Sequence, residues 1–175
     1  MAEQEDTADS ALNGDQDSGP QVSAITQYIK DLSGENPSAP QVFQWQGTPQ
    51  LDVQFNIAVN RISEEVHEVV LRIELKAGSE QGAHFIVDLS YAGLFGLRNV
   101  PEDSLPPFLL VEAPRLLFPF ARQIVAETVS NLGFPPVLLD PVDFGATYMA
   151  QLEAANNEAA GADRQLADVD PAGNA

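Results

Sequence analysis

The chain has 175 residues and a mass of 18.8 kDa, and 44% of its residues are hydrophobic, so it can fold as one domain with a sizeable core. Its 26 acidic and eight basic side chains give a formal charge of -18 at pH 7. Such a chain repels phosphate groups, and we expect no nucleic-acid partner. The sequence contains no cysteine, which excludes disulfides, thiolate nucleophiles and zinc sites built on sulfur. Its start is acidic and it has no apolar run of about 18 residues, so we expect a cytoplasmic protein without direct membrane insertion.

Both ends of the chain differ in composition from the middle. Residues 1–20 hold six acidic residues and no Lys or Arg, and residues 156–175 are similarly poor in bulky side chains. We therefore expect an acidic disordered tail over residues 1–20, one domain over residues 21–155, and an acidic flexible tail over residues 156–175.

The first half of the domain is predicted to form four β-strands. The first covers residues 24–32, and the others cover residues 51–60, 68–77 and 83–95, where apolar and polar side chains alternate. Such alternation is typical of antiparallel strands with one face on the core and one face in water. The side chains predicted to face the core are Leu51, Val53, Phe55, Ile57, Val59, Val69, Leu71, Ile73, Leu75, Phe85, Val87, Leu89 and Tyr91.

The opposite face of the fourth strand is predicted to be exposed to solvent, yet its side chains are not uniformly polar. Its outward positions are His84, Ile86, Asp88 and Ser90, so one bulky aliphatic side chain lies among polar neighbours. Single exposed aliphatic residues are common and often carry no meaning. The other explanation for Ile86 is that a partner covers it, and the sequence pattern leaves both open.

The second half of the domain is predicted to be helical. Over residues 115–132, Leu117, Ala121 and Val125 fall on one apolar stripe, and Gly133 followed by two prolines suits the end of that helix. A last helix is expected to begin near Asp140 as its N-cap, with Pro141 in the first turn. Strands first and helices afterwards predict an α+β fold, with a four-stranded antiparallel sheet and helices packed on one face.

No motif in the sequence supports catalysis or metal binding. The pair His67–Glu68 opens a zinc-protease pattern, but Leu71 stands where a second histidine is needed. The triplet DFG at residues 143–145 has none of the other kinase motifs before it, and a helix-capping role accounts for Asp143. We therefore expect no enzyme, no cofactor, no catalytic residue and no metal site.

Four long blocks of the sequence closely resemble the SecB family of protein-export chaperones. They read YIKDLSGENPSAPQVF, EVVLRIELKA, YAGLFGLRNVPE and VEAPRLLFPFARQIVAETVSNLGFPPVLLDPVDFGATY. The resemblance runs from about Gln21 to Gln151 and includes neither tail. One residue departs from the family's pattern, because Gly34 stands where members usually carry phenylalanine, so the local surface at the end of the first strand should differ.

The resemblance implies a cytoplasmic homotetramer, a dimer of dimers, that is not an enzyme and uses no nucleotide. It implies a chaperone that holds unfolded precursor proteins in a translocation-competent state and delivers them to the translocation ATPase SecA. In the family, the acidic outer face of the sheet receives the zinc-bearing basic C-terminal segment of SecA. Matching motif to motif places this docking site on Asp31, Glu35, Ile86 and Asp88.

The resemblance also implies hydrophobic grooves for extended client segments, beside the sheet and next to the chain after the fourth strand. Apolar contact suits that task because it is non-directional. Our candidates for the groove wall are Phe43, Trp45, Val53 and Phe55 from the strand region, and Leu109, Leu110, Leu116 and Phe118 from an apolar loop. For each of them the alternative is a place in the core or in a subunit interface. For the whole protein the alternative is an acidic oligomeric adaptor that binds one folded partner.

Overall fold

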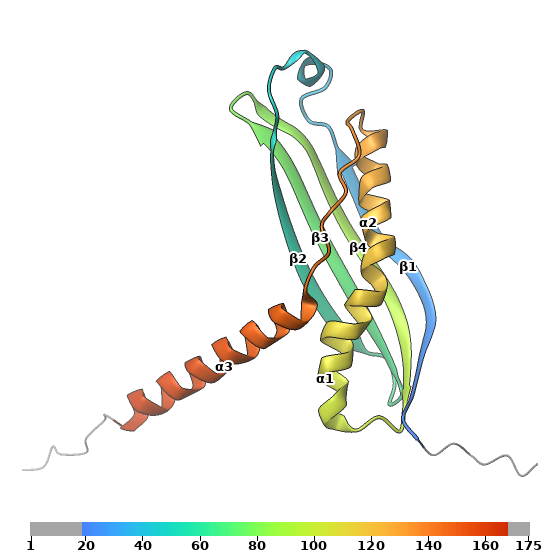
Figure 1. Ribbon diagram of the computed structural model, residues 1–175, viewed down its shortest axis with the longest axis vertical. Helices are drawn as coiled ribbons and strands as arrows, with labels where there is room; N and C mark the ends of the chain where they lie inside the picture. The colour runs from blue at the N-terminus through green and yellow to red at the C-terminus, as the bar shows by residue number, and fades with distance from the viewer. Residues whose placement is uncertain (1–18, 168–175) are drawn as a thin grey trace, which may run out of the picture.

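The computed structural model describes residues 19–167, which form a four-stranded antiparallel sheet with helices on one face (Figure 1). The strands are β1 (Gln21–Glu35), β2 (Gln50–Arg61), β3 (Val66–Ser79) and β4 (Gly82–Arg98), in the order β1-β4-β3-β2. Because β1 and β2 are the two edges, the chain between them crosses one end of the sheet, where it forms the short 3-10 helix η1 (Gln41–Gln44). The predicted α+β fold is confirmed.

The two central strands carry the core, as their alternation predicts. On β3, the side chains of Val69, Leu71, Ile73 and Leu75 are fully buried, and the predicted inward side chains of β4 are buried as well. Apolar and polar side chains also alternate along the edge strand β2, but its inward side chain Phe55 keeps 37% of its surface exposed. The helix that covers the sheet packs mainly on β4 and β3, so the inner face of β2 stays partly open.

Helical structure begins earlier than the sequence predicts. After the turn η2 (Glu102–Ser104), the short helix α1 (Leu105–Pro107), the π-helical turn η3 (Phe108–Glu112) and α2 (Ala113–Asn131) follow without a break. The apolar loop predicted for Leu109 and Leu110, before the helix expected at residue 115, is therefore wrong. Pro114 has no N–H for the carbonyl of Leu110, and the Ala113 N–H donates to Phe108, five residues back, so the helix widens at this point instead of breaking.

The last helix, α3 (Phe144–Ala167), begins after Asp143, so the start predicted at Asp140 is wrong. Asp143 is the cap, because its Oδ1 accepts a hydrogen bond of 2.9 Å from the Ala146 N–H. The chain before it, residues 134–143, runs extended beside α2 along the length of the sheet (Figure 1). An extended chain covers about 3.3 Å per residue against 1.5 Å in a helix. These ten residues between α2 and α3 can therefore run back along the length of α2 only if they stay extended.

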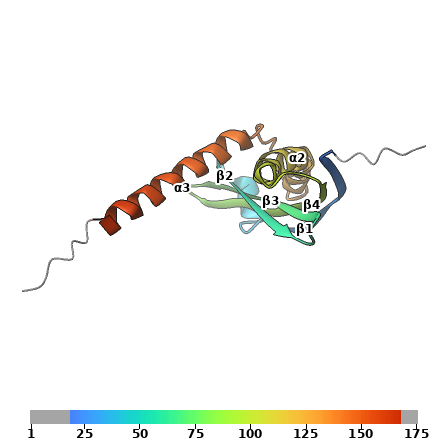
Figure 2. The ribbon, with the colours of Figure 1, turned by 90° about the horizontal axis from the view of Figure 1, so that it is seen from below.

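Only the first turns of α3 touch the rest of the domain. Phe144 is buried and Tyr148 packs against the core, whereas Leu152 is exposed, and the helix projects away from the sheet (Figures 1 and 2). It includes residues 156–167, for which the sequence predicts a flexible tail. Of the predicted tails, residues 1–18 and 168–175 lie outside the described residues.

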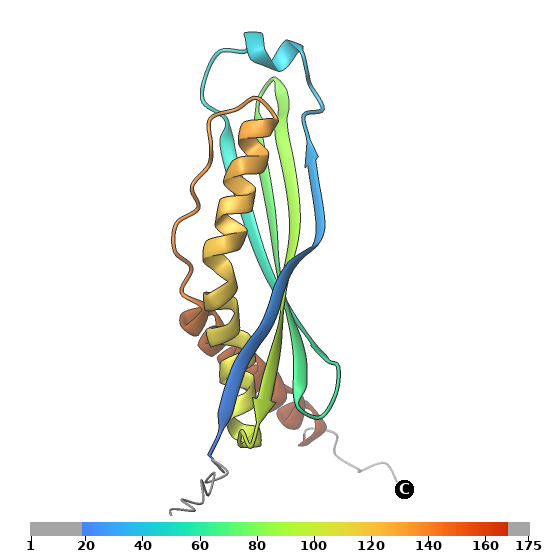
Figure 3. The same cartoon turned by 90° about the vertical axis from the view of Figure 1, so that its right-hand side faces the viewer.

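The two faces of the sheet differ sharply. Figures 2 and 3 show α2 on one face, and within residues 19–167 no α-helix covers the opposite face. Gly34 of β1 points to the helix side, since a Cβ there would lie 2.8 Å from Thr128 Cγ2 of α2. The departure at Gly34 therefore concerns the packing of β1 under α2 and not the open face. No helix in the described part is long and apolar enough to cross a membrane.

Candidate functional site

The uncovered face of the sheet carries the four residues predicted to dock a partner: Asp31, Glu35, Ile86 and Asp88. Glu35 pairs with Ile86 across β1 and β4, so these two side chains lie next to each other. Asp31 pairs with Ser90, two residues along β4 from Asp88. Side chains two apart on a strand share a face. The structure thus gathers all four residues in one small area at the end of β1.

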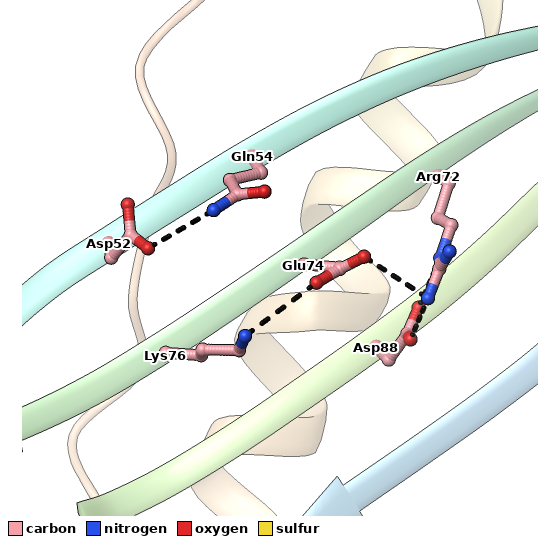
Figure 4. A network of polar contacts seen from close by, with 6 residues as sticks. All are labelled: Asp52, Gln54, Arg72, Glu74, Lys76 and Asp88. Atoms are coloured by element: carbon pink, nitrogen blue, oxygen red, sulfur yellow. Dashed lines mark hydrogen bonds and ion pairs between the residues drawn. The ribbon is translucent and has the colours of Figure 1, made fainter.

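Arg72 of β3 is bound to one of these carboxylates (Figure 4). Its Nε donates to Asp88 Oδ1 at 3.0 Å and its Nη2 to Oδ2 at 2.5 Å. The same Nη2 lies 3.1 Å from Glu74 Oε1, and Lys76 Nζ lies 3.8 Å from Glu74 Oε2. The hydrogen bonds from Arg72 hold the pKa of Asp88 below its usual value, so this carboxylate stays charged near neutral pH but is already neutralised by a neighbour.

Glu68 forms a second polar cluster on this face, farther along β3. It accepts hydrogen bonds from Lys30 Nζ at 2.8 and 3.0 Å, from the Tyr28 hydroxyl at 2.5 Å and from Asn60 Nδ2 at 2.8 Å. These donors, Lys30 first, lower the pKa of Glu68 to about 2, and the carboxylate in turn raises the pKa of Tyr28. Because its donors come from β1 and β2, Glu68 links three strands.

The two docking candidates without an ion pair in the described part of the chain, Asp31 and Glu35, both lie on β1. Lys30 is the only basic residue of that strand, and Glu68 holds it. Within residues 19–167, neither Asp31 nor Glu35 forms an ion pair. In the same range, no three His, Cys, Asp or Glu side chains gather closely enough to bind a metal ion. A basic partner would find unpaired carboxylates at Asp31 and Glu35 and also on β2 at Asp52, whose Oδ2 accepts a hydrogen bond from Gln54 (Figure 4).

Part of the predicted groove wall meets on the helix side of the sheet, at its β2 edge. A cavity of about 290 Å³ lies between β2, η3 and the start of α3, and Phe55 and Leu110 line it. The ring centroid of Phe118 is 6.1 Å from that of Phe55 and 6.0 Å from that of Phe144. Val53 lies two residues along β2 from Phe55 on the same face. Of the eight candidates, Phe55 and Leu110 thus line the cavity, whereas Phe118 is buried in the core beside Phe55, and Val53 packs against that core.

Two other candidates, Phe43 and Trp45, lie apart from this cavity, where the chain crosses the end of the sheet. The Trp45 ring meets His84 edge-on with centroids 5.1 Å apart, and Phe43 lies 5.6 Å from Phe134. His84 is buried by these contacts, and its Nε2 lies 3.1 Å from Ser79 Oγ. The expectation that His84 faces water is therefore wrong, because Trp45 folds over it.

The last two candidates differ from each other in exposure. Leu109 is buried in the core, whereas Leu116 is about half exposed on α2, as is Phe120. The edge strand β1 also exposes Val22 and Ile25. These exposed apolar side chains lie away from the cavity, since none of them lines it.

Comparisons with known proteins agree with this architecture. The family described as preprotein translocase subunit SecB matches residues 15–155. The protein-export protein SecB of Sphingopyxis alaskensis is 51% identical over 163 residues, 93% of this chain and 91% of the relative. That of Rhizorhabdus wittichii is 51% identical over 175 residues, all of both chains. A SecB-like chaperone of Mycobacterium tuberculosis, solved in complex with a ChAD peptide from the HigA1 antitoxin, has a TM-score of 0.58 at 18% identity. That likeness covers 69% of this chain and 90% of the other, and it concerns the fold.

Proposed function

The chain belongs to the SecB family and is a protein-export chaperone, and on this premise we propose how its two sheet faces divide the task. The helix side holds extended segments of unfolded precursor proteins. The uncovered side docks the basic, zinc-bearing C-terminal segment of SecA, to which the client is delivered. The protein works in the cytoplasm, as a homotetramer built as a dimer of dimers, without catalysis and without a cofactor.

The cavity beside β2, with a largely apolar wall, is the observation that carries the client proposal. Phe55 and Leu110 line it, and Phe55 still exposes 37% of its surface. Burying the remaining apolar area under a client side chain is favourable at about 25 cal/mol per Å² and makes little demand on which side chain enters. A surface of this kind suits a chaperone whose clients share no detailed sequence.

Two unpaired carboxylates of β1 and one aliphatic side chain of β4 support the docking proposal. Glu35 lies opposite Ile86, which is half-buried on a face without helical cover, and Asp31 lies four residues back along β1 on the same face. The chain as a whole carries a charge of -18, so its summed potential draws a basic segment toward this face. Ile86 then supplies the apolar contact, so the partner that covers it is the SecA segment.

Exposed apolar side chains outside the cavity support the assembly proposal. Leu116 and Phe120 are half exposed on α2, and β1 presents Val22 and Ile25 at the edge of the sheet. Monomeric proteins rarely leave large contiguous apolar patches in water, and most soluble oligomers bury such patches between identical subunits. We place these residues in the contacts between subunits of the tetramer.

The proposal is tested by asking how many unrelated chains the protein binds. Several unfolded precursors and their folded forms are added separately, and the mass of each mixture is measured by light scattering. We expect stable complexes with most of the unfolded chains and with none of the folded ones. An adaptor for one folded partner would show the reverse, and that result would contradict the proposal.

A further inference from the structure

Two carboxylates of the uncovered face lie directly opposite each other on neighbouring strands. Glu74 of β3 pairs with Asp88 of β4 in the antiparallel register, and like charges in that arrangement repel. A cation placed between them relieves the repulsion. Arg72 fills this position in the structure, with one guanidinium nitrogen 2.5 Å from Asp88 and 3.1 Å from Glu74 (Figure 4).

We propose that Arg72 is an internal competitor for the docking face, and that it occupies the anionic position that a Lys or Arg of the SecA segment would take. The inference rests on the proposed docking of that basic segment. An incoming cation has the same charge and hydrogen-bonding chemistry as the guanidinium. It must therefore displace Arg72 or use only carboxylates that form no ion pair within residues 19–167, such as Asp31 and Glu35. Arg72 thus sets how tightly the partner binds and how strongly salt weakens the complex.

Displacement is feasible because the contacts of Arg72 are exposed. The side chains of Arg72, Glu74 and Asp88 keep 46%, 30% and 28% of their surface in water. Ion pairs with this much solvent exposure are screened and contribute little to stability. Breaking them therefore costs little free energy. The pair Lys30–Glu68 is different, since Glu68 is almost fully buried, and we do not expect a partner to displace Lys30.

The competitor makes the contribution of Asp88 depend on Arg72. In the parent protein Arg72 already occupies the Asp88 carboxylate, whereas in Arg72→Gln that carboxylate is free to bind the partner. Asp88→Asn should therefore weaken docking less in the parent protein than in a protein that already carries Arg72→Gln. This coupling between two contacting residues is measurable in a double-mutant cycle.

The experiment titrates the zinc-loaded C-terminal segment of SecA into the full-length protein at about 50 and about 200 mM salt. Arg72→Gln should tighten binding about threefold at the lower salt and less at the higher salt, because an exposed charge is removed. The matched control is Arg98→Gln, which makes the same change ten residues along β4, roughly 33 Å from Asp88. That distance is several Debye lengths, so the affinity should stay within the error of the measurement.

Asp31→Lys separates failure of the inference from failure of the proposed function. If Asp31→Lys weakens binding while Arg72→Gln leaves it unchanged or weakens it too, the docking face is right and the competitor role is wrong. If neither variant changes the affinity, docking on this face is wrong and the inference falls with it. Circular dichroism and light-scattering mass, taken for every variant, show that fold and assembly are intact.

Discussion

Replacing Glu68 by Gln should loosen the uncovered face where three strands are linked through one carboxylate. The pKa of Glu68 falls from its usual value of 4.5 to about 2, chiefly through the hydrogen bonds from Lys30. At about 1.4 kcal/mol per pKa unit, this shift gives an upper value of about 3 kcal/mol. Lys30 keeps 47% of its side chain in water, so solvent screens part of the interaction. We expect Glu68→Gln to lower the free energy of unfolding by about 1–2 kcal/mol at pH 7.

The effect of Glu68 should depend on pH in a defined direction. Because its folded-state pKa is depressed, the stabilisation is fully present above pH 4.5 and is lost as the pH falls toward 2. Urea unfolding of parent and variant, followed by circular dichroism at one protein concentration, measures this difference at pH 7 and pH 3. The control is Glu65→Gln, since that carboxylate is more than half exposed and its pair with Arg98 is worth less than about 0.5 kcal/mol. Equal stability at pH 7, or a loss that is undiminished at pH 3, would refute the reasoning.

Three further predictions concern the groove, the docking face and the assembly. Replacing Phe55 and Leu110 together by Ser should weaken the binding free energy for unfolded chains by about 1 kcal/mol per side chain, since part of each side chain is already buried. Unchanged binding by a folded double variant would exclude this cavity as the client site. Ile86→Ser should weaken binding of the SecA segment equally at low and high salt, because it removes apolar contact and no charge, and a changed salt slope would contradict this. Changing Leu116 and Phe120 together to Glu should lower the mass seen in light scattering, whereas an intact tetramer would show that these residues lie outside the subunit contacts.

The sheet could be predicted because its pattern is local. Val69, Leu71, Ile73 and Leu75 alternate with polar residues, and that alternation decides which side of a strand is buried. The effects of proline were harder to predict, because they depend on distant packing. Pro114 widens a continuous helix instead of ending a loop, and Pro141 lies in an extended segment that must span the length of the sheet.

The docking residues were predicted from the family resemblance, but their charged neighbours were not. Lys30 and Glu68 lie 38 residues apart in the sequence, and they meet only through the order of the strands. Arg72 meets Asp88 within one hairpin, yet an irregularity between Ala77 and Gly78 shifts the register by one residue. Counting back from the turn therefore gives the wrong partners.

Apolar composition could not separate the groove wall from the core. Leu109 and Leu110 are consecutive and chemically identical, yet the first is buried and the second lines the cavity. Both residues lie in the helical turn η3, where consecutive side chains point in different directions. The same limit holds for Phe43 and Trp45, whose neighbours Phe134 and His84 are far away in the sequence.

Independent binding of two partners on opposite faces of one sheet is the claim on which this account depends. The most direct test titrates the zinc-loaded SecA segment into the protein alone and into the protein saturated with an unfolded precursor. Because the sheet lies between the two sites, the Kd should agree within about twofold, and light scattering should show a ternary complex. Competition between precursor and segment, with no ternary complex at saturation, would contradict the account.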